Sequence, residues 1–323
     1  MEQLIDIILL GFLLMIAIAA IKLRDLFAVV MLFGIYSLLT AALFMDLDAV
    51  DVAFTEAAVG AGVTTVLMLS SLRLVGRHEK RYPHGPLLPL VVVFITGAAL
   101  VYGTLDAPLM GDPNAPAHQH VAPYYLEKGP AEVGIPNVVT AVLASYRGFD
   151  TFGETFVIFT AGLAVLLLLG TDPGPHIRRG RAAIGNQLVL RVVVKFLIPF
   201  ILLYALYVQF HGDFGAGGGF QAGVIFATGF VLYSLVFGEG DARLVLPPSW
   251  LPRIAALGVL LYGGVGLYAL LMGQPFLDYS ALSEDPVAGQ HLGVLLVELG
   301  VGLTVFAVVF AIFTALSGRS HKT

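Results

Sequence analysis

The sequence predicts an all-α integral membrane protein with about nine transmembrane helices. Hydrophobic residues make up 58% of the 323 positions, the mean hydropathy is +0.90, and only 12% of the residues are charged. Soluble domains carry roughly 25% charged residues, and a soluble fold of this length has too little interior to hide so much apolar side chain. A lipid bilayer removes that constraint, so the composition places the chain in a membrane.

Nine apolar runs are long enough to cross the hydrocarbon layer, which takes about 20 helical residues. Each run is expected to form a helix, because lipid offers backbone groups no hydrogen-bond partners. The fifth run is short, which leaves room for its helix to begin earlier. The first run starts with acidic rather than basic residues, so we expect a retained span and not a cleaved signal. The runs are Leu4–Ile21, Leu26–Met45, Val50–Leu72, Leu87–Leu105, Glu154–Gly170, Leu188–Phe210, Ala216–Phe237, Leu251–Met272 and His291–Leu316.

Lysine and arginine are distributed unevenly between the two sides that nine spans would define. One side holds nearly all of them, including Arg77, Arg179 and Arg243, whereas the other holds only Lys128 and Arg147. Basic residues favour the cytoplasmic side. The N-terminus is therefore predicted to lie outside and the C-terminus in the cytoplasm of a cell inner membrane.

Two long connections divide the chain into three predicted sections, 1–82 with three helices, 83–175 with two and 176–323 with four. The outer connection Asp106–Gly153 contains a mildly amphipathic stretch, Pro136–Tyr146, which predicts an interfacial helix. The connection Asp172–Gln187 is basic and contains glycine and proline, as linkers between modules do.

Some functions are excluded by composition. The chain has no cysteine, so disulfides, iron–sulfur clusters and thiolate zinc sites are ruled out on this chain. The net charge is −5, and no basic stretch is interleaved with aromatics, so nucleic-acid binding is not expected.

Glu56 is an acidic residue inside the third run, with Gly60 and Thr64 continuing its helical stripe. A charge within a membrane span is costly and usually has a function or a partner. One interpretation is a titratable carboxylate on a proton or cation path, and the other is a charge that pairs with a neighbouring subunit for assembly.

Glu298 lies seven residues after His291 and therefore on the same face of the last run. It is about 10 Å deeper than His291 at 1.5 Å per residue. Few structural roles explain a lone carboxylate at that depth, which favours a place on an ion path. His291 is either a relay to Glu298 or an ordinary interfacial histidine.

Lys195 lies four residues before Pro199 in the sixth run. Proline cannot donate to the carbonyl of Lys195, so a kink is expected there. The lysine either takes part in a charge pair or relay, or reaches back to the cytoplasmic interface.

The remaining candidates lie at the predicted outer edge. The segment HGDFGAGGGFQAG (residues 211–223) predicts a compact glycine turn, and Arg147 is expected to pair with Asp150. The outer-edge charges are Asp48, Asp51, Arg147, Asp150 and Glu154, and the turn glycines are Gly217, Gly218, Gly219 and Gly223.

Several of these segments resemble components of Mrp-type (Mnh/Sha) multisubunit Na+/H+ antiporters. The region 191–223, together with the helix HLGVLLVELGVGLTV, resembles the MnhB/MrpB component. RGFDTFGE resembles the small two-helix module (MbhE type) at the end of the large subunit, and DVAFTEAAVGAGVTTVLM resembles the adjacent three-helix module (MbhD type). The match of GGGFQAG and its preceding helix is the most specific.

The resemblance implies an accessory, non-catalytic subunit of a hetero-oligomeric cation/proton antiporter. It implies large antiporter-like subunits and small membrane subunits as partners, Na+ and H+ as the transported ions, and no cofactor on this chain. Glu56, Lys195 and Glu298 match charged positions of the family. The glutamate–lysine–lysine axis of the large subunits is missing, so this chain is not expected to pump alone.

Two alternatives remain open at this point. The same module occurs in redox-driven complexes such as membrane-bound hydrogenases, whose metal clusters lie on other subunits. The chain could also be a structural scaffold, whose membrane charges only hold interfaces together.

Overall fold

The computed structural model describes residues 2–80, 87–109, 111–170 and 187–318. Within these ranges the regular structure is helical, apart from an isolated bridge between Asp25 and His78. Nine helices of the described residues are long and apolar enough to cross a membrane. The predicted fold class is thus confirmed. The crossing helices are α1 (Glu2–Lys22), α2 (Leu26–Asp46), the continuous α3–η1–α4 (Val50–Glu56, Ala57–Thr64, Thr65–Val75), α5 (Leu87–Thr104), α8 (Gly148–Leu169), α9 (Leu188–His211), α10 (Gly219–Phe237), α12 (Leu251–Leu271) and α13 (Pro286–Ser317).

The predicted boundaries need three corrections. The fifth span begins at Gly148 rather than Glu154, the seventh begins at Gly219 rather than Ala216, and the ninth begins at Pro286 rather than His291. Asp285 explains the last shift, because its side chain accepts a hydrogen bond from the amide of Val287 and caps the helix.

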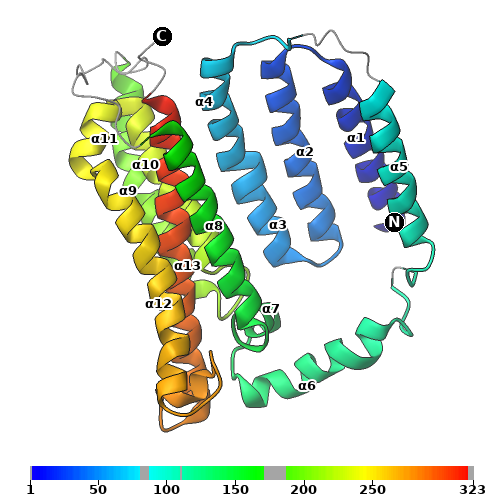
Figure 1. The fold of residues 1–323 in the computed structure, drawn as a ribbon, viewed down its shortest axis with the longest axis vertical. Helices are drawn as coiled ribbons and strands as arrows, with labels where there is room; N and C mark the ends of the chain where they lie inside the picture. The colour runs from blue at the N-terminus through cyan, green and yellow to red at the C-terminus, as the bar shows by residue number, and fades with distance from the viewer. Residues whose placement is uncertain (1, 81–86, 110, 171–186, 319–323) are drawn as a thin grey trace.

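The connection Asp106–Gly153, which is predicted to lie outside, contains more helix than the sequence indicated. The predicted interfacial helix is present as α7 (Val138–Thr140) and the π-helical η3 (Ala141–Tyr146). The helical stretch before it, η2 (Ala117–Val121) and α6 (Ala122–Glu132), was missed. Pro123, Gly129 and Pro130 lie within this stretch, and they mask the helical pattern. Figure 1 shows α6 running along one end of the molecule between α5 and α7.

Short helices also occur in the last third of the chain. They are α11 (Glu239–Val245), η4 (Pro248–Trp250) and η5 (Tyr279–Leu282). The predicted section boundaries at 82/83 and 175/176, and nearly all of the linker 172–187, lie outside the described residues.

Helix α13 is the centre of the main bundle and packs against α8, α10 and α12 (Figure 1). Helices α1 to α4 form a second group, which contacts the bundle where η1 meets α10 and where α4 meets α13. Almost all residues of helix α5 are exposed. In a membrane, lipid or another protein would cover such an apolar surface.

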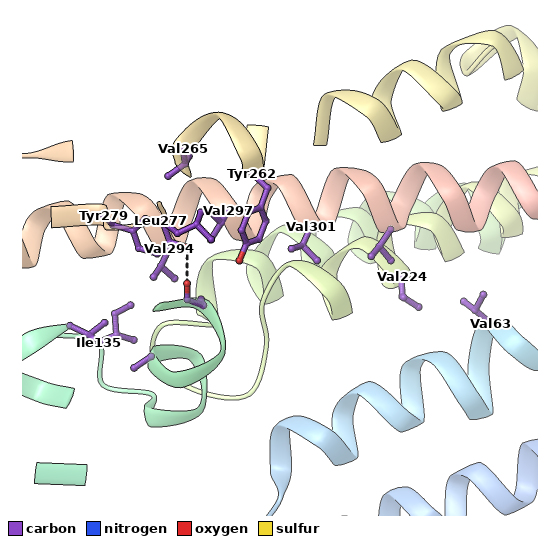
Figure 2. Packing of buried hydrophobic residues seen from close by; sticks show 14 residues of the cluster. Val63, Ile135, Val224, Tyr262, Val265, Leu277, Tyr279, Val294, Val297 and Val301 are labelled. Carbon is purple, nitrogen blue, oxygen red and sulfur yellow. Dashed lines mark hydrogen bonds between the residues drawn. The ribbon is translucent and has the colours of Figure 1, made fainter. Parts of the chain in front are cut away.

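The main hydrophobic cluster follows α13 and draws residues from every part of the chain. Figure 2 shows Val294, Val297 and Val301 of α13 beside Tyr262 of α12, with Val63 of η1 at one end. Tyr262 and Tyr279 are fully buried, and their hydroxyls donate to the carbonyl oxygens of Gly148 and Ala144 at 2.7 and 2.8 Å. These bonds fix η3 and the start of α8 against the last third of the chain.

Glycines set the distances between α10, α12 and α13. A methyl group on Gly219 would overlap the carbonyl oxygen of Glu298, and one on Gly223 would lie 2.6 Å from the carbonyl oxygen of Gly302. Small residues allow membrane helices to approach this closely. Gly219 and Gly223 were predicted as turn glycines; this is wrong, because both lie within α10 and pack on α13.

Helix α12 offers a matched test of this packing. Gly258 faces Gly300 and Thr304 of α13, where an added methyl group would overlap both, whereas Gly264 has open space around it. We expect Gly258→Ala to destabilise the purified protein by about 1–3 kcal/mol, the usual cost of overpacking. Gly264→Ala is the control and should not destabilise the protein. Equal thermal unfolding curves for the two variants would contradict the packing argument.

Candidate functional site

The centre of the candidate site is the glycine loop, residues 212–218, which joins α9 to α10. It folds back on the end of α9, because the amide of Gly218 donates to the carbonyl of Val208 at 3.1 Å. Gly218 has a φ of +116°, a conformation that side chains disfavour. A methyl group on Gly217 would lie 2.7 Å from the same carbonyl oxygen. The predicted compact turn is present at these two glycines.

Two other parts of the chain bind the glycine loop. The Asp51 carboxylate, in the first turn of α3, accepts a hydrogen bond from the amide of Gly217 at 3.2 Å. The Thr140 hydroxyl of α7 donates to the carbonyl of Gly212 at 2.7 Å. All three predicted sections of the chain therefore meet at this loop.

Glu298 of α13 lies against the glycine loop. A methyl group on Gly218 would be 3.0 Å from Oε1 of Glu298, and one on Gly212 would be 3.1 Å from Oε2. Within the described residues the carboxylate has no hydrogen-bond partner and no ion pair. A membrane carboxylate in this state leaves its oxygens available to water, a proton or a cation.

A cavity of about 260 Å³ opens beside Glu298. Its lining combines apolar side chains with acidic, hydroxyl and amide groups, and among the described residues it contains no lysine, arginine or histidine. The volume is enough for several water molecules, and carboxylate, hydroxyl and carbonyl oxygens are the ligands that hard cations prefer. The polar side chains include Asp51, Thr55, Thr140, Glu154, Gln221 and Glu298.

One hydrogen bond crosses the cavity wall between α3 and α10. Gln221 is buried, and its Nε2 donates to Oγ1 of Thr55 at 2.8 Å. The Thr55 hydroxyl in turn donates to the carbonyl of Asp51 at 2.9 Å. These bonds orient the Thr55 and Gln221 side chains, so the polar lining is held in place rather than free to rotate.

His291 and Asp213 lie next to each other at the predicted outer end of α13. Nδ1 of His291 is 3.7 Å from the Asp213 carboxylate, and Nε2 is 3.1 Å from the carbonyl oxygen of Gly134. Burial raises the pKa of Asp213 above its ordinary value, and His291 partly opposes this. Asp213 was not among the predicted site residues, although it lies within the segment 211–223 that was predicted to form the glycine turn.

The structure does not bring Glu56 and Glu298 together. Glu56 precedes the π-helical η1, and its carboxylate faces α2, because a methyl group on Gly60 would contact both Oε1 of Glu56 and Oγ of Ser37. It does not line the cavity. π-Helical turns occur frequently at functional sites, so its predicted role stays open.

Lys195 is exposed on α9. No ion pair involves it within the described part of the chain, so the structure pairs it with neither Glu56 nor Glu298. Helix α9 continues through Pro199 to His211. Its place on an ion path stays a prediction.

The outer-edge charges separate into two groups. The expected Arg147–Asp150 pair is present at 2.7 Å, but both side chains are exposed, and such pairs contribute little. Asp48 lies in the exposed turn between α2 and α3. Asp51 and Glu154 instead line the cavity. No group of three or more histidine, aspartate or glutamate side chains is placed to hold a metal in the described ranges.

Three family models match consecutive parts of the chain. The MbhD model, which describes the D component of MBH, matches residues 11–77, and the MbhE model, which describes the E component, matches residues 90–175. The model described as "Domain related to MnhB subunit of Na+/H+ antiporter" matches residues 189–311. Asp51 and Thr55 thus lie in the first match, Thr140 and Glu154 in the second, and the glycine loop and Glu298 in the third.

The MnhB match extends to whole relatives. The putative antiporter subunit mnhB2 of Staphylococcus haemolyticus (strain JCSC1435) is 34% identical over 136 residues, which is 41% of this chain and 96% of that protein. The chain belongs to the MnhB family of antiporter subunits. Here the MnhB part is fused to MbhD and MbhE parts, as the resemblance predicted.

A second relative contains the whole arrangement. It is named as a K+/H+ antiporter subunit of the combined A/B type, from Rhizobium meliloti (strain 1021), and is 28% identical over 334 residues, or 91% of this MnhB-family chain. The aligned region is 32% of that relative, so the chain spans about a third of its length.

Solved structures agree with the fold. A chain of the Mrp complex from Dietzia sp. DQ12-45-1b matches 96% of this MnhB-family chain with a TM-score of 0.75 and 26% identity, over 34% of its own length. A chain of the membrane-bound sulfane sulfur reductase, an archaeal respiratory membrane complex, matches 71% of this chain and 96% of its own length. Its TM-score is 0.55 and its identity 28%. The protein is a multi-pass protein of the cell membrane.

The Asp213 environment predicts a pH-dependent stability. Because burial raises its pKa, the folded protein holds this proton more tightly than the unfolded chain, and the resulting stability is lost as the pH rises through the folded-state pKa. Relative to wild type, Asp213→Asn should therefore gain thermal stability as the pH rises from about 4 to 8.

Thermal unfolding of the purified protein across this range measures the effect. The exposed residue Asp106 provides the control, because Asp106→Asn makes the same change without burial. A difference between Asp213→Asn and wild type that stays constant with pH would rule out the assigned cause.

Proposed function

We propose that this chain is an accessory membrane subunit of a cation/proton antiporter complex, and that the cavity at Glu298 is part of its ion passage. The observation that carries the proposal is the Glu298 carboxylate, which has no partner in the described part of the chain. It is held against the glycine loop in an acidic cavity whose described lining residues include no basic side chain. The family and the similarity to a chain of the Mrp complex support it.

The cavity suggests how exchange operates at Glu298. A charged carboxylate within the membrane is costly, and either a proton or a monovalent cation removes that cost. The two ions then compete for one carboxylate, and Thr55, Thr140 and Gln221 supply further polar groups on the wall. Binding one ion displaces the other, which is the elementary requirement of antiport.

Further features follow from this assignment. The transported ions are Na+ and H+, the chain carries no cofactor and no catalytic site of its own, and the driving force comes from the ion gradients and the membrane potential. The partners are large antiporter-like subunits and small membrane subunits. The lysine and arginine distribution supports an outer N-terminus, which places the cavity near the outer side.

A redox-driven complex is the second candidate, because a chain of an archaeal respiratory membrane complex has a similar fold. Purification of the tagged chain in mild detergent separates the two. Co-purifying antiporter-type subunits without metal-cluster proteins support the antiporter. Soluble cluster-binding subunits would favour the redox complex.

Glu298→Gln tests the passage directly. We expect the complex to assemble and the cation concentration for half-maximal exchange to rise about tenfold or more, since one interaction with a charged group contributes about 1.5–3 kcal/mol. Cation-induced pH changes in inverted membrane vesicles measure this, with Na+ and K+ compared. Glu284→Gln, at an exposed site outside the cavity, is the control. An intact complex with unchanged pH and cation dependence would remove Glu298 from the passage and leave the scaffold interpretation.

Glu56→Gln tests the second membrane glutamate. The substitution keeps the shape of a side chain that packs against Gly60 and Ser37, so assembly should survive. If Glu56 is on the passage, the same vesicle assay should show slower exchange at saturating cation. Normal assembly together with normal transport would show that Glu56 has no part in it.

A further inference from the structure

The Asn137 side chain forms hydrogen bonds both as an acceptor and as a donor. Its Oδ1 accepts hydrogen bonds from the amides of Val139 at 3.0 Å and Thr140 at 3.4 Å, which caps the start of α7. Its Nδ2 donates to the carbonyl oxygens of Gly212 at 3.1 Å and Gly215 at 2.9 Å. A helix cap needs only the acceptor, so the two donated bonds serve another purpose.

The donated bonds reach the glycine loop from a part of the chain about 75 residues away. The backbone amide of Asn137 adds a third bond, to the carbonyl of Asp213 at 3.0 Å. The Thr140 hydroxyl adds a fourth, to Gly212. The segment 137–140 therefore satisfies the carbonyls of Gly212, Asp213 and Gly215. The glycines of this loop give it little rigidity of its own.

The loop position matters because the same residues surround Glu298. Gly212 is bonded to Asn137 on one side and lies against Oε2 of Glu298 on the other. Gly217 and Gly218 line the cavity itself. A loop that moved outward would enlarge the space at the carboxylate and change which ligands a bound cation meets.

We propose that Asn137 is a positioning residue, which clamps the glycine loop against Glu298 and so sets the geometry of the cavity. The inference rests on the proposed function insofar as the cavity carries ions. Asn137 does not touch the passage; it acts through the loop carbonyls.

The two roles of Asn137 can be separated by substitution. Asn137→Asp keeps an acceptor for the helix cap, but it replaces the Nδ2 donor by an oxygen facing the carbonyls of Gly212 and Gly215. Asn137→Ala removes both the cap and the donor. Thr140→Val is a milder, nearly isosteric variant that deletes one bond to Gly212. Asn114→Asp makes the same chemical change at an exposed site of the outer connection and is the control.

A first readout follows the loop without transport. The chain contains no cysteine, so Ala216→Cys places a single thiol on it, at a half-buried position in the loop. We expect Asn137→Asp and Asn137→Ala to speed maleimide labelling of this thiol about tenfold in the detergent-solubilised complex, since two hydrogen bonds are lost. Thr140→Val should give a smaller increase, and Asn114→Asp none.

The second readout is the cation dependence of exchange in vesicles, without the added cysteine. We expect Asn137→Asp to raise the cation concentration for half-maximal exchange with little effect on the maximal rate, because the carboxylate is retained and only its surroundings change.

The outcomes distinguish the clamp from the cap and from the passage. Faster labelling in both Asn137 variants, with a shifted cation dependence, supports the proposal. Faster labelling in Asn137→Ala alone overturns the proposal, because losing the helix cap would then account for the effect. Faster labelling in neither variant also overturns it, because the donated bonds would then not hold the loop. If the Asn137 variants fail to assemble, the Thr140→Val variant decides. Faster labelling in Thr140→Val then supports the proposed clamp, and unchanged labelling overturns it. Faster labelling with unchanged cation dependence supports the clamp and counts against the cavity as an ion passage, which is a failure of the proposed function.

Discussion

The site depends on the need of buried backbone groups for hydrogen-bond partners. The glycine loop joins two membrane helices, and its carbonyl and amide groups lie outside the regular hydrogen bonding of either helix. Lipid and apolar side chains cannot satisfy such groups. Asp51, Asn137 and Thr140 supply the missing partners from two other parts of the chain. Satisfying one loop therefore brings α3, α7 and α10 together, and the cavity lies where they meet.

Glycine serves two purposes at this junction that depend on each other. Within α10, Gly219 and Gly223 let the helix approach α13 closely, which places the start of α10 next to Glu298. Within the loop, Gly217 and Gly218 allow the turn that returns from α9. Side chains at the first pair would separate the helices, and side chains at the second would strain the turn. Either change would alter the surroundings of the carboxylate.

The membrane fold could be predicted because lipid imposes a simple rule. A run of about 20 apolar residues has almost no alternative to a helix, so all nine spans were found and the errors lay at their ends. Those ends depend on local caps, such as Asp285 at the start of α13. Helix α6 was missed because prolines and glycines masked its pattern.

The site was predictable only in part, because hydropathy and charge act locally whereas the cavity is built from distant residues. Glu298 stood out as a charge in an apolar run. The roles of Asn137 and Thr140 had no such signal, since their partners lie more than 70 residues away. For Lys195 the sequence left two interpretations open, and its exposure on α9 does not decide between them.

The relatives differ in whether the MnhB part is joined to the other parts in one chain. The mnhB2 protein of Staphylococcus haemolyticus aligns to only 41% of this chain along nearly its whole length, whereas the relative in Rhizobium meliloti includes all parts in a much longer chain. The residues that bind the glycine loop lie outside the MnhB match, in the MbhD and MbhE matches. Where these parts are separate chains, the loop carbonyls need the same partners, so the hydrogen bonds seen here within one chain would become contacts between subunits. Fusion lowers the entropic cost of bringing these parts together, and it leaves the geometry at Glu298 to the same few hydrogen bonds.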